Sequence, residues 1–134
     1  MKKQLIVQGL VLGLVFMGQS IAYAVDANQG KEMYLQYCSS CHGQDGRGDG
    51  SVSAFLKVKV PDLTVLKKKN KGIYPLDAVI LAIDGRRKLR SHGDPKMPVW
   101  GESFSREVKD PKSAEVAVGA REKAIAEYVA TLQR

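Results

Sequence analysis

The sequence contains few of the residues that build metal clusters and disulfide frameworks. Its 134 residues include 2 cysteines, 2 histidines and 1 tryptophan. Two cysteines are too few for a miniprotein held by several disulfides, and the two residue types together are too few for a Cys/His zinc array. The length favours one domain and excludes a large enzyme with a separate substrate domain. Hydrophobic residues make up 44% and charged residues 26%, which is typical of a folded protein and argues against general disorder.

Long apolar runs are absent except at the start of the chain, where the pattern is typical of an export signal. Lys2 and Lys3 precede an apolar stretch of 13 residues, 5–17, and Ala22-Tyr23-Ala24 follows it. A basic start, a short apolar segment and a small-x-small tripeptide indicate a signal peptide. The alternative is an uncleaved membrane anchor, but a span needs about 20 apolar residues, which this stretch does not reach.

We therefore predict that residues 1–24 are a signal peptide, cleaved after Ala24, and that residues 25–134 form the exported domain. The signal looks bacterial, which predicts a periplasmic location. The residue directly after the cut is Val25 rather than a cysteine, so a lipid anchor is not indicated. We expect no stable membrane insertion, and nothing in the sequence requires more than a monomer.

Both cysteines belong to one motif. Cys38-Ser39-Ser40-Cys41-His42 is a C-x-x-C-H run, the pattern of covalent c-type haem attachment. Two thiols at this spacing can reach both vinyl groups of one porphyrin, and the adjacent histidine can then ligate the iron. A thioredoxin-type redox pair needs a strand before the motif, and residues 26–42 show no β-branched alternation. A zinc site lacks ligands. We predict one haem c attached through Cys38 and Cys41, with His42 as an axial ligand.

The identity of the second axial ligand decides whether the iron is closed to substrates. Met33 lies too close to Cys38, on the same expected helix, to reach the opposite haem face, so we assign it to core packing. Met97 lies in residues 93–101, where two prolines and two glycines predict a stiff loop. Such a loop can hold a weakly binding thioether against iron, so Met97 is favoured over His92.

At these residues the chain resembles the class I cytochromes c of the bacterial monohaem kind, over essentially all of residues 26–134. Gly30 and Tyr34 precede the haem motif as a glycine and an aromatic residue do on that family's first helix. The resemblance implies that Gly30 lets the last helix cross closely, with Tyr128 as the matching aromatic residue.

Pro61-Asp62-Leu63 resembles the family's Pro-x-Leu element. The resemblance implies that the Pro61 carbonyl accepts a hydrogen bond from Nδ1 of His42, and that Leu63 packs on the haem. A contact of this kind fixes the imidazole and tunes the iron. Further candidates for haem contacts are Arg47, Tyr74 and Trp100, for which simple packing is the alternative.

Apolar periodicity predicts three main helices, over residues 27–38, 75–84 and 113–132. The second has apolar residues at i, i+3, i+4 and i+7, between Pro75 and Gly85. Residues 64–69 form a short extra turn, and the glycine-rich residues 43–50 a flexible surface loop. No strand alternation is present. The fold class is therefore all-α, a small cytochrome c fold with three main helices around one haem.

Positive charge is concentrated in one part of the chain. Residues 57–96 contain eleven basic and four acidic residues, against a formal net charge of +7 for the whole sequence. The basic residues are Lys57, Lys59, Lys67, Lys68, Lys69, Lys71, Arg86, Arg87, Lys88, Arg90 and Lys96. The cluster lacks the interleaved aromatic residues of a nucleic-acid site. It is either a solvated face that aids solubility or a basic face that steers an acidic redox partner. In the second case Arg86, Arg87, Lys88 and Arg90 are our candidates for steering.

These observations predict a periplasmic electron-transfer protein rather than an enzyme. Iron capped by His42 and Met97 has no open position, so one electron moves and no substrate binds. The protein would act as a soluble carrier or as the haem subunit of a respiratory or dehydrogenase complex, with a donor dehydrogenase or quinol-cytochrome reductase and an acceptor oxidase or reductase as partners. The alternative is a haem enzyme or gas-binding sensor. It needs a displaceable Met97, and His92 as a distal acid–base group.

Overall fold

The computed structural model describes residues 27–86 and 97–134, and within these ranges the chain is helical and contains no strand. The elements in chain order are α1 (Ala27–Tyr37), α2 (Ser39–His42), η1 (Ser53–Phe55), η2 (Leu63–Val65), α3 (Leu66–Lys69), α4 (Leu76–Asp84), α5 (Trp100–Arg106) and α6 (Pro111–Thr131). The predicted all-α class is confirmed. The predicted signal peptide, residues 1–24, lies outside the described residues. In the described part of the chain no helix has the length and apolar character to span a membrane.

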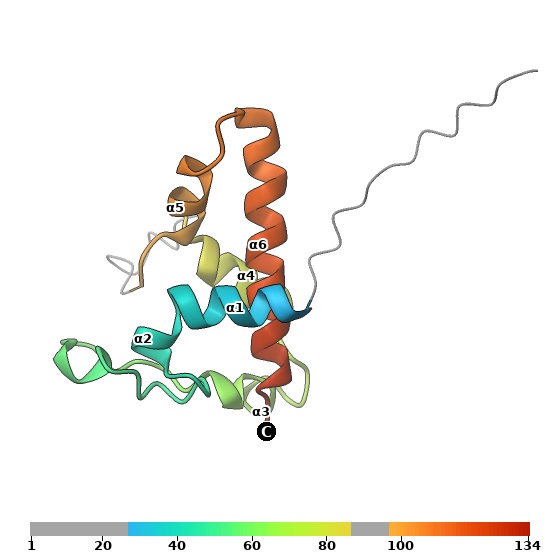
Figure 1. Ribbon diagram of the computed structural model, residues 1–134. Coiled ribbons are helices and arrows are strands. Elements are labelled where there is room, and N and C mark those ends of the chain that lie inside the picture. Colours follow the sequence, from blue (N-terminus) through green and yellow to red (C-terminus); the bar gives the residue numbers. More distant parts are fainter. Residues whose placement is uncertain (1–26, 87–96) are drawn as a thin grey trace, which may run out of the picture.

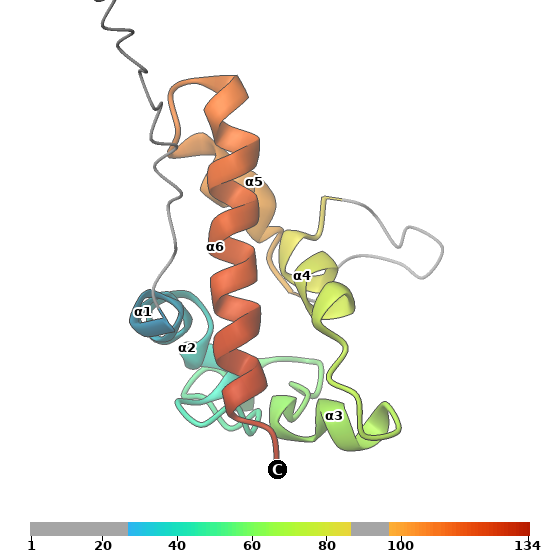
Figure 2. The ribbon, with the colours of Figure 1, turned by 90° about the vertical axis from the view of Figure 1, so that its right-hand side faces the viewer.

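Helix α6 is the centre of the fold. In Figures 1 and 2, α1 crosses α6 near its carboxyl-terminal half, while α4 and α5 pack along other parts of it. The largest fully buried side chains lie at these contacts: Tyr34, Phe104, Val118 and Ile125. Helices α1, α4, α5 and α6 therefore build one hydrophobic core, and Cys38 belongs to the same cluster of buried residues.

The crossing of α1 over α6 depends on Gly30. A Cβ atom at this position would overlap the carbonyl oxygen of Ala124 and lie 3.4 Å from the Cβ of Tyr128. Tyr34, one turn further along α1, packs on Tyr128 with the ring centroids 5.2 Å apart. The close helix crossing implied by the family resemblance is therefore confirmed.

The helix ends follow from capping residues. Helix α4 ends at Gly85, which adopts the left-handed conformation with φ 65° and donates its N–H to the Leu81 carbonyl. Helix α6 begins at Pro111, two residues before the predicted start. The carboxylate of Asp110 accepts a hydrogen bond from the Ser113 N–H at 3.0 Å, and proline suits the first helical position.

Helix α5 was not predicted. The sequence indicated a stiff loop through residue 101, whereas the helix begins at Trp100 and continues to Arg106. Trp100 and Phe104 lie one turn apart on it, with ring centroids 5.8 Å apart, and Tyr37 of α1 contacts both rings. This short helix is therefore stabilised by packing of its aromatic side chains against α1.

The last two residues bind the segment that follows Pro61. The Gln133 amide donates to the Leu63 carbonyl at 2.8 Å, and the Arg134 backbone N–H donates to the Thr64 carbonyl at 3.0 Å. Arg134 also forms an ion pair of 3.0 Å with Asp62. Residues 62–64 are thereby fixed to the end of α6.

Candidate functional site

The two thiols and the imidazole of the motif are presented by one turn of helix. Cys38 lies at the junction of α1 and α2, and the His42 N–H donates to the Cys38 carbonyl at 2.9 Å. Cys38 is buried and Cys41 half-buried, and both are free thiols. Burial, followed by the charge of Cys41, raises the pKa of Cys38 to about 12. Thiols of disulfide oxidoreductases have lowered pKa values, so this environment does not fit a thioredoxin-type redox pair.

His42 is oriented by a backbone carbonyl. Its Nδ1 lies 3.4 Å from the carbonyl oxygen of Pro61, which can only accept a hydrogen bond, so Nδ1 carries the proton and Nε2 keeps a free lone pair. Burial lowers the pKa of His42, and the Pro61 contact opposes this in part. The ring is therefore kept as the neutral imidazole that a metal ion needs. The Pro61 contact implied by the family resemblance is confirmed.

The glycine-rich residues 43–50 pack closely against the motif, which corrects our description of them as a flexible loop. The Gly48 and Gly50 N–H groups donate to the carbonyls of His42 and Cys41 at 2.8 and 3.1 Å. A Cβ atom at Gly48, where φ is 80°, would also overlap the Val60 carbonyl oxygen. The loop is therefore a support that satisfies the carbonyls of α2.

Met97 is half-buried and packs against the core cluster that contains Cys38, and Met33 packs against the same cluster, as predicted for a core residue. His92, the alternative ligand, lies outside the described residues. Several other apolar side chains pack on this core and stay partly exposed: Leu63, Tyr74, Leu76, Val79, Ile80 and Trp100. A large apolar group such as a porphyrin suits such a surface. The apolar surface, the two thiols and the neutral imidazole together fit a covalently bound haem.

The other candidate contacts have different surroundings. Trp100 packs between Tyr37 and Phe104. The Tyr74 hydroxyl donates to the Ala126 carbonyl at 2.7 Å, so its proton is engaged with α6, and burial raises the pKa of Tyr74 to about 12. Arg47 is exposed on the glycine-rich loop.

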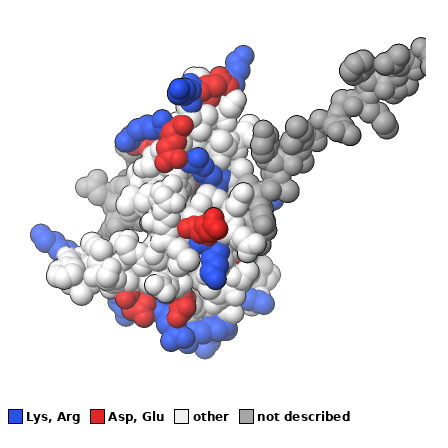
Figure 3. Space-filling model, viewed as in Figure 1, with Lys and Arg blue, Asp and Glu red and all other residues white. Residues whose placement is uncertain are grey.

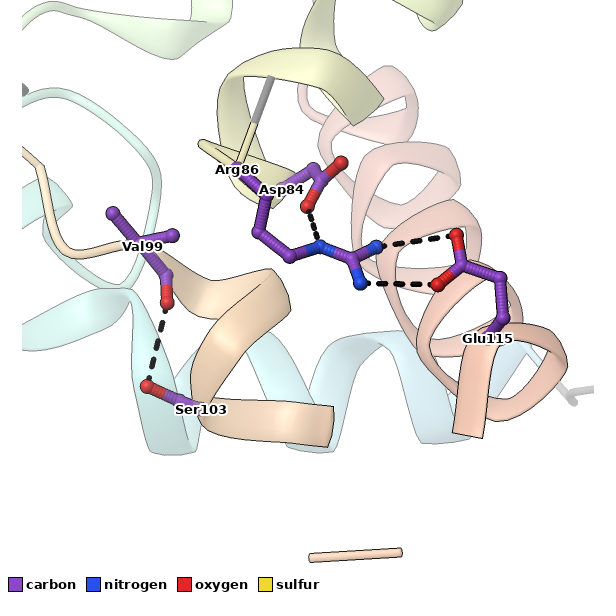
Figure 4. Close-up of polar contacts among 5 residues, drawn as sticks. All are labelled: Asp84, Arg86, Val99, Ser103 and Glu115. Carbon is purple, nitrogen blue, oxygen red and sulfur yellow. Dashed lines mark hydrogen bonds and ion pairs between the residues drawn. The ribbon is translucent and has the colours of Figure 1, made fainter. Parts of the chain in front are cut away.

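The predicted basic face divides into two parts. Arg86 is bound by the carboxylates of Asp84 and Glu115, which corrects its assignment as a free steering residue (Figure 4). Residues 87–96 lie outside the described residues. The remaining lysines are exposed and form no ion pair within the described ranges: Lys57, Lys59, Lys67, Lys68, Lys69 and Lys71. Figure 3 shows basic side chains at the lower edge, where α3 lies in Figure 1, and at the tip formed by the segment between α2 and α3.

Comparison with models of protein families gives a match over most of the chain. A family model described as "Cytochrome C oxidase, cbb3-type, subunit III" matches residues 25–110. The matched range contains the four residues of the candidate site: Cys38, Cys41, His42 and Met97. No curated protein and no solved structure matches the chain.

Proposed function

Because the chain belongs to the family of cbb3-type cytochrome c oxidase subunit III domains, we propose that it transfers electrons in the periplasm through a single covalently attached haem. Family membership shows a class I cytochrome c with an all-α cytochrome c fold and a haem-based role in electron transfer. Domains of this family usually act as electron carriers rather than enzymes. The export signal at residues 1–24 supports the periplasmic location, where the protein works as a soluble carrier or as a haem subunit of an oxidase or dehydrogenase complex.

The observation that carries this proposal is the orientation of His42. Its Nδ1–H is held by Pro61, so Nε2 is the atom left to bind iron, and His42 directly follows Cys41 in the sequence. Cys38 and Cys41 would hold the porphyrin through carbon–sulfur bonds to its two vinyl groups, and His42 would ligate the iron. A bound haem supplies reversible one-electron chemistry at its iron. The chain orients the ligand, excludes water and tunes the potential.

Met97 is our proposed sixth ligand, and its replacement gives the first prediction. Met97→Leu keeps the volume but removes the sulfur. We expect the ferric protein to lose the weak far-red sulfur-to-iron absorption band, and the reduced protein to bind carbon monoxide readily. Visible spectra of the oxidised and reduced protein measure both. Met33→Leu is the matched control, since Met33 packs in the core, and it should keep the band.

Visible spectra of the unsubstituted protein distinguish the electron carrier from the haem enzyme or gas sensor. A low-spin ferric spectrum with the far-red band supports an electron carrier capped by His42 and Met97. A high-spin ferric spectrum, or carbon monoxide binding by the unsubstituted reduced protein, would contradict the proposed role of Met97 and support the haem enzyme or gas sensor.

We propose that the redox partner docks beside the haem motif, on a surface made of Val52, Phe55, Leu56, Lys57 and Lys59, here called the η1 surface. Phe55 is 84% exposed, and Val52 and Leu56 are also exposed. The lysines add positive charge around these apolar side chains. This combination suits a partner with an apolar contact area rimmed by acidic residues.

The η1 surface lies close to the predicted point of haem attachment. The Val52 N–H donates to the Ser40 carbonyl at 2.9 Å, and η1 packs on α2. At the other end of the surface, Lys59 lies two residues before Pro61, which holds His42. A partner seated here would approach the haem motif directly.

Charge reversal tests this placement without a known partner. With hexacyanoferrate(III) as an anionic oxidant at low ionic strength, Lys57→Glu/Lys59→Glu should slow oxidation of the reduced protein by about threefold or more, and added salt should diminish the difference. Lys112→Glu, at the start of α6 and far from α2 in Figure 1, is the control and should change the rate less. Equal rates for both variants at low salt would contradict docking through the η1 surface.

A further inference from the structure

Three charged groups meet where α4 ends against α6. Nε of Arg86 donates to Oδ1 of Asp84, and the two terminal nitrogens of the same guanidinium donate to the Glu115 carboxylate at 3.0 and 3.4 Å (Figure 4). Only 10% of the Asp84 side chain and 28% of the Arg86 side chain are exposed. The Asp84–Arg86 pair is thus partly shielded from solvent, whereas the Glu115 side chain is 72% exposed, and the two pairs link the end of α4 to α6.

This cluster also contacts the chain where it returns after residues 87–96. A Cβ atom at Gly101, in the first turn of α5, would overlap both Oδ1 of Asp84 and Nε of Arg86. Gly85 lies between Asp84 and Arg86, and a Cβ atom there would lie 3.3 Å from Cα of Val99. The chain just before residues 87–96 is therefore packed on Val99, and the chain just after them is packed on the Asp84–Arg86 ion pair. Met97 lies two residues before Val99.

A third carboxyl group, that of Glu122 on α6, lies within electrostatic reach of the cluster. Glu122 is seven residues after Glu115, which places the two on the same face of the helix. It is 3% exposed, and its Oε1 has no hydrogen-bond partner in the described part of the chain. The nitrogens of Arg86 that form hydrogen bonds are already bound to Asp84 and Glu115, so they leave Glu122 unpaired.

The charges around Glu122 disfavour its ionised form. The groups within electrostatic reach are Asp84 and Arg86, from the end of α4, and Glu115, from α6 itself. Burial first, and then the Asp84 carboxylate, raise the pKa of Glu122 to about 7, while Arg86 lowers it and Glu115 raises it. With Glu122 protonated, one guanidinium faces two carboxylates. With Glu122 ionised, it faces three.

We propose that Asp84, Arg86 and Glu115 are positioning residues for Met97, and that Glu122 makes this positioning depend on pH. The proposal rests on the proposed role of Met97 as an iron ligand. When Glu122 holds its proton, Arg86 stays with Asp84 and Glu115, and the chain that leads into and out of residues 87–96 stays packed together. When Glu122 loses its proton, its carboxylate competes for Arg86. The ion pairs that pack against Gly101 then weaken, and Met97 is held less firmly.

The test follows the far-red sulfur-to-iron band of the ferric holoprotein between about pH 5 and pH 8.5. In the unsubstituted protein we expect the band to weaken as the pH rises, with a midpoint near the pKa of Glu122, about 7. Glu122→Gln has nearly the same shape and cannot ionise, so it should keep the full band across this range. Glu127→Gln, an exposed change on the same helix, is the matched control and should titrate like the unsubstituted protein.

A second pair of variants tests positioning without titration. Arg86→Gln should weaken the band at about pH 5.5, and Arg86→Lys should restore part of it, because lysine keeps the charge. Arg106→Gln removes a surface ion pair with Glu102 and should leave the band intact. Far-ultraviolet circular dichroism of each variant shows whether the helices are retained.

Each outcome is decisive. A band in Arg86→Gln as strong as in the unsubstituted protein, or an unchanged pH transition in Glu122→Gln, overturns the positioning cluster while leaving Met97 as a ligand. An unsubstituted protein without the band even at about pH 5.5 overturns the role of Met97 itself, and with it this proposal.

Discussion

A variant with alanine at both Cys38 and Cys41 is expected to contain no covalently bound haem. Both thiols lie on one helical turn next to the oriented imidazole of His42, and the chain has no other cysteine. Without them, no side chain can form the carbon–sulfur bonds to the porphyrin. Haem-stained denaturing gels and the mass of the intact protein measure the loss.

Two controls define this result. Ser40→Ala changes an exposed side chain within the same turn and should leave covalent attachment intact. Each single cysteine variant should keep no more than one of the two bonds, so extraction under acid conditions should become easier. Covalent haem in the double variant would contradict the assignment of the motif.

Gly30→Ala is expected to lower the free energy of unfolding by about 2 kcal/mol, although alanine is the better helix former. The added methyl group would overlap the carbonyl oxygen of Ala124, which belongs to the backbone of α6 and cannot rotate away. The two helices would have to separate, and the packing of Tyr34 on Tyr128 would weaken. Urea unfolding, followed by circular dichroism, gives the difference.

Gly119→Ala provides the matched comparison. Gly119 lies on α6, and a Cβ atom there would meet nothing within 4 Å. The helix propensity of alanine should then raise the free energy of unfolding by up to about 1 kcal/mol. Changes of opposite sign in the free energy of unfolding would separate the steric effect at Gly30 from helix propensity. A stabilised Gly30→Ala variant would show that the crossing tolerates a side chain.

Periodicity predicted the helices whose apolar face is continuous. Helix α4 shows it clearly, since Leu76, Val79 and Ile80 pack on the core and Gly85 ends the helix as predicted. Helix α5 was missed because prolines and glycines precede it and because it has only seven residues. The spacing of Trp100 and Phe104, one helical turn apart, was a signal in the sequence that indicates it.

The site was predictable where the motif alone decides the chemistry. The roles of Gly30 and Pro61 came from the family resemblance, and the structure gives them a physical reason. The surroundings of Arg86 and Glu122 could not be predicted. Arg86 belongs to a basic run, and Glu122 lies between Arg121 and Lys123, so both look like exposed surface charges in the sequence. Their burial is decided by where α4 meets α6, a tertiary contact.

The shared core of α1 and α6 sets an order of events for maturation. Cys38 is buried in a cluster that also contains Ile125 and Val129 of α6, a helix that follows the haem motif in the chain. Until that helix arrives, the cluster is incomplete, and the Cys38 thiol is open to whatever delivers the porphyrin. Once α6 docks under Gly30, the thiol is enclosed. Covalent haem attachment is therefore expected before α6 docks on α1, while the Cys38 thiol is still accessible.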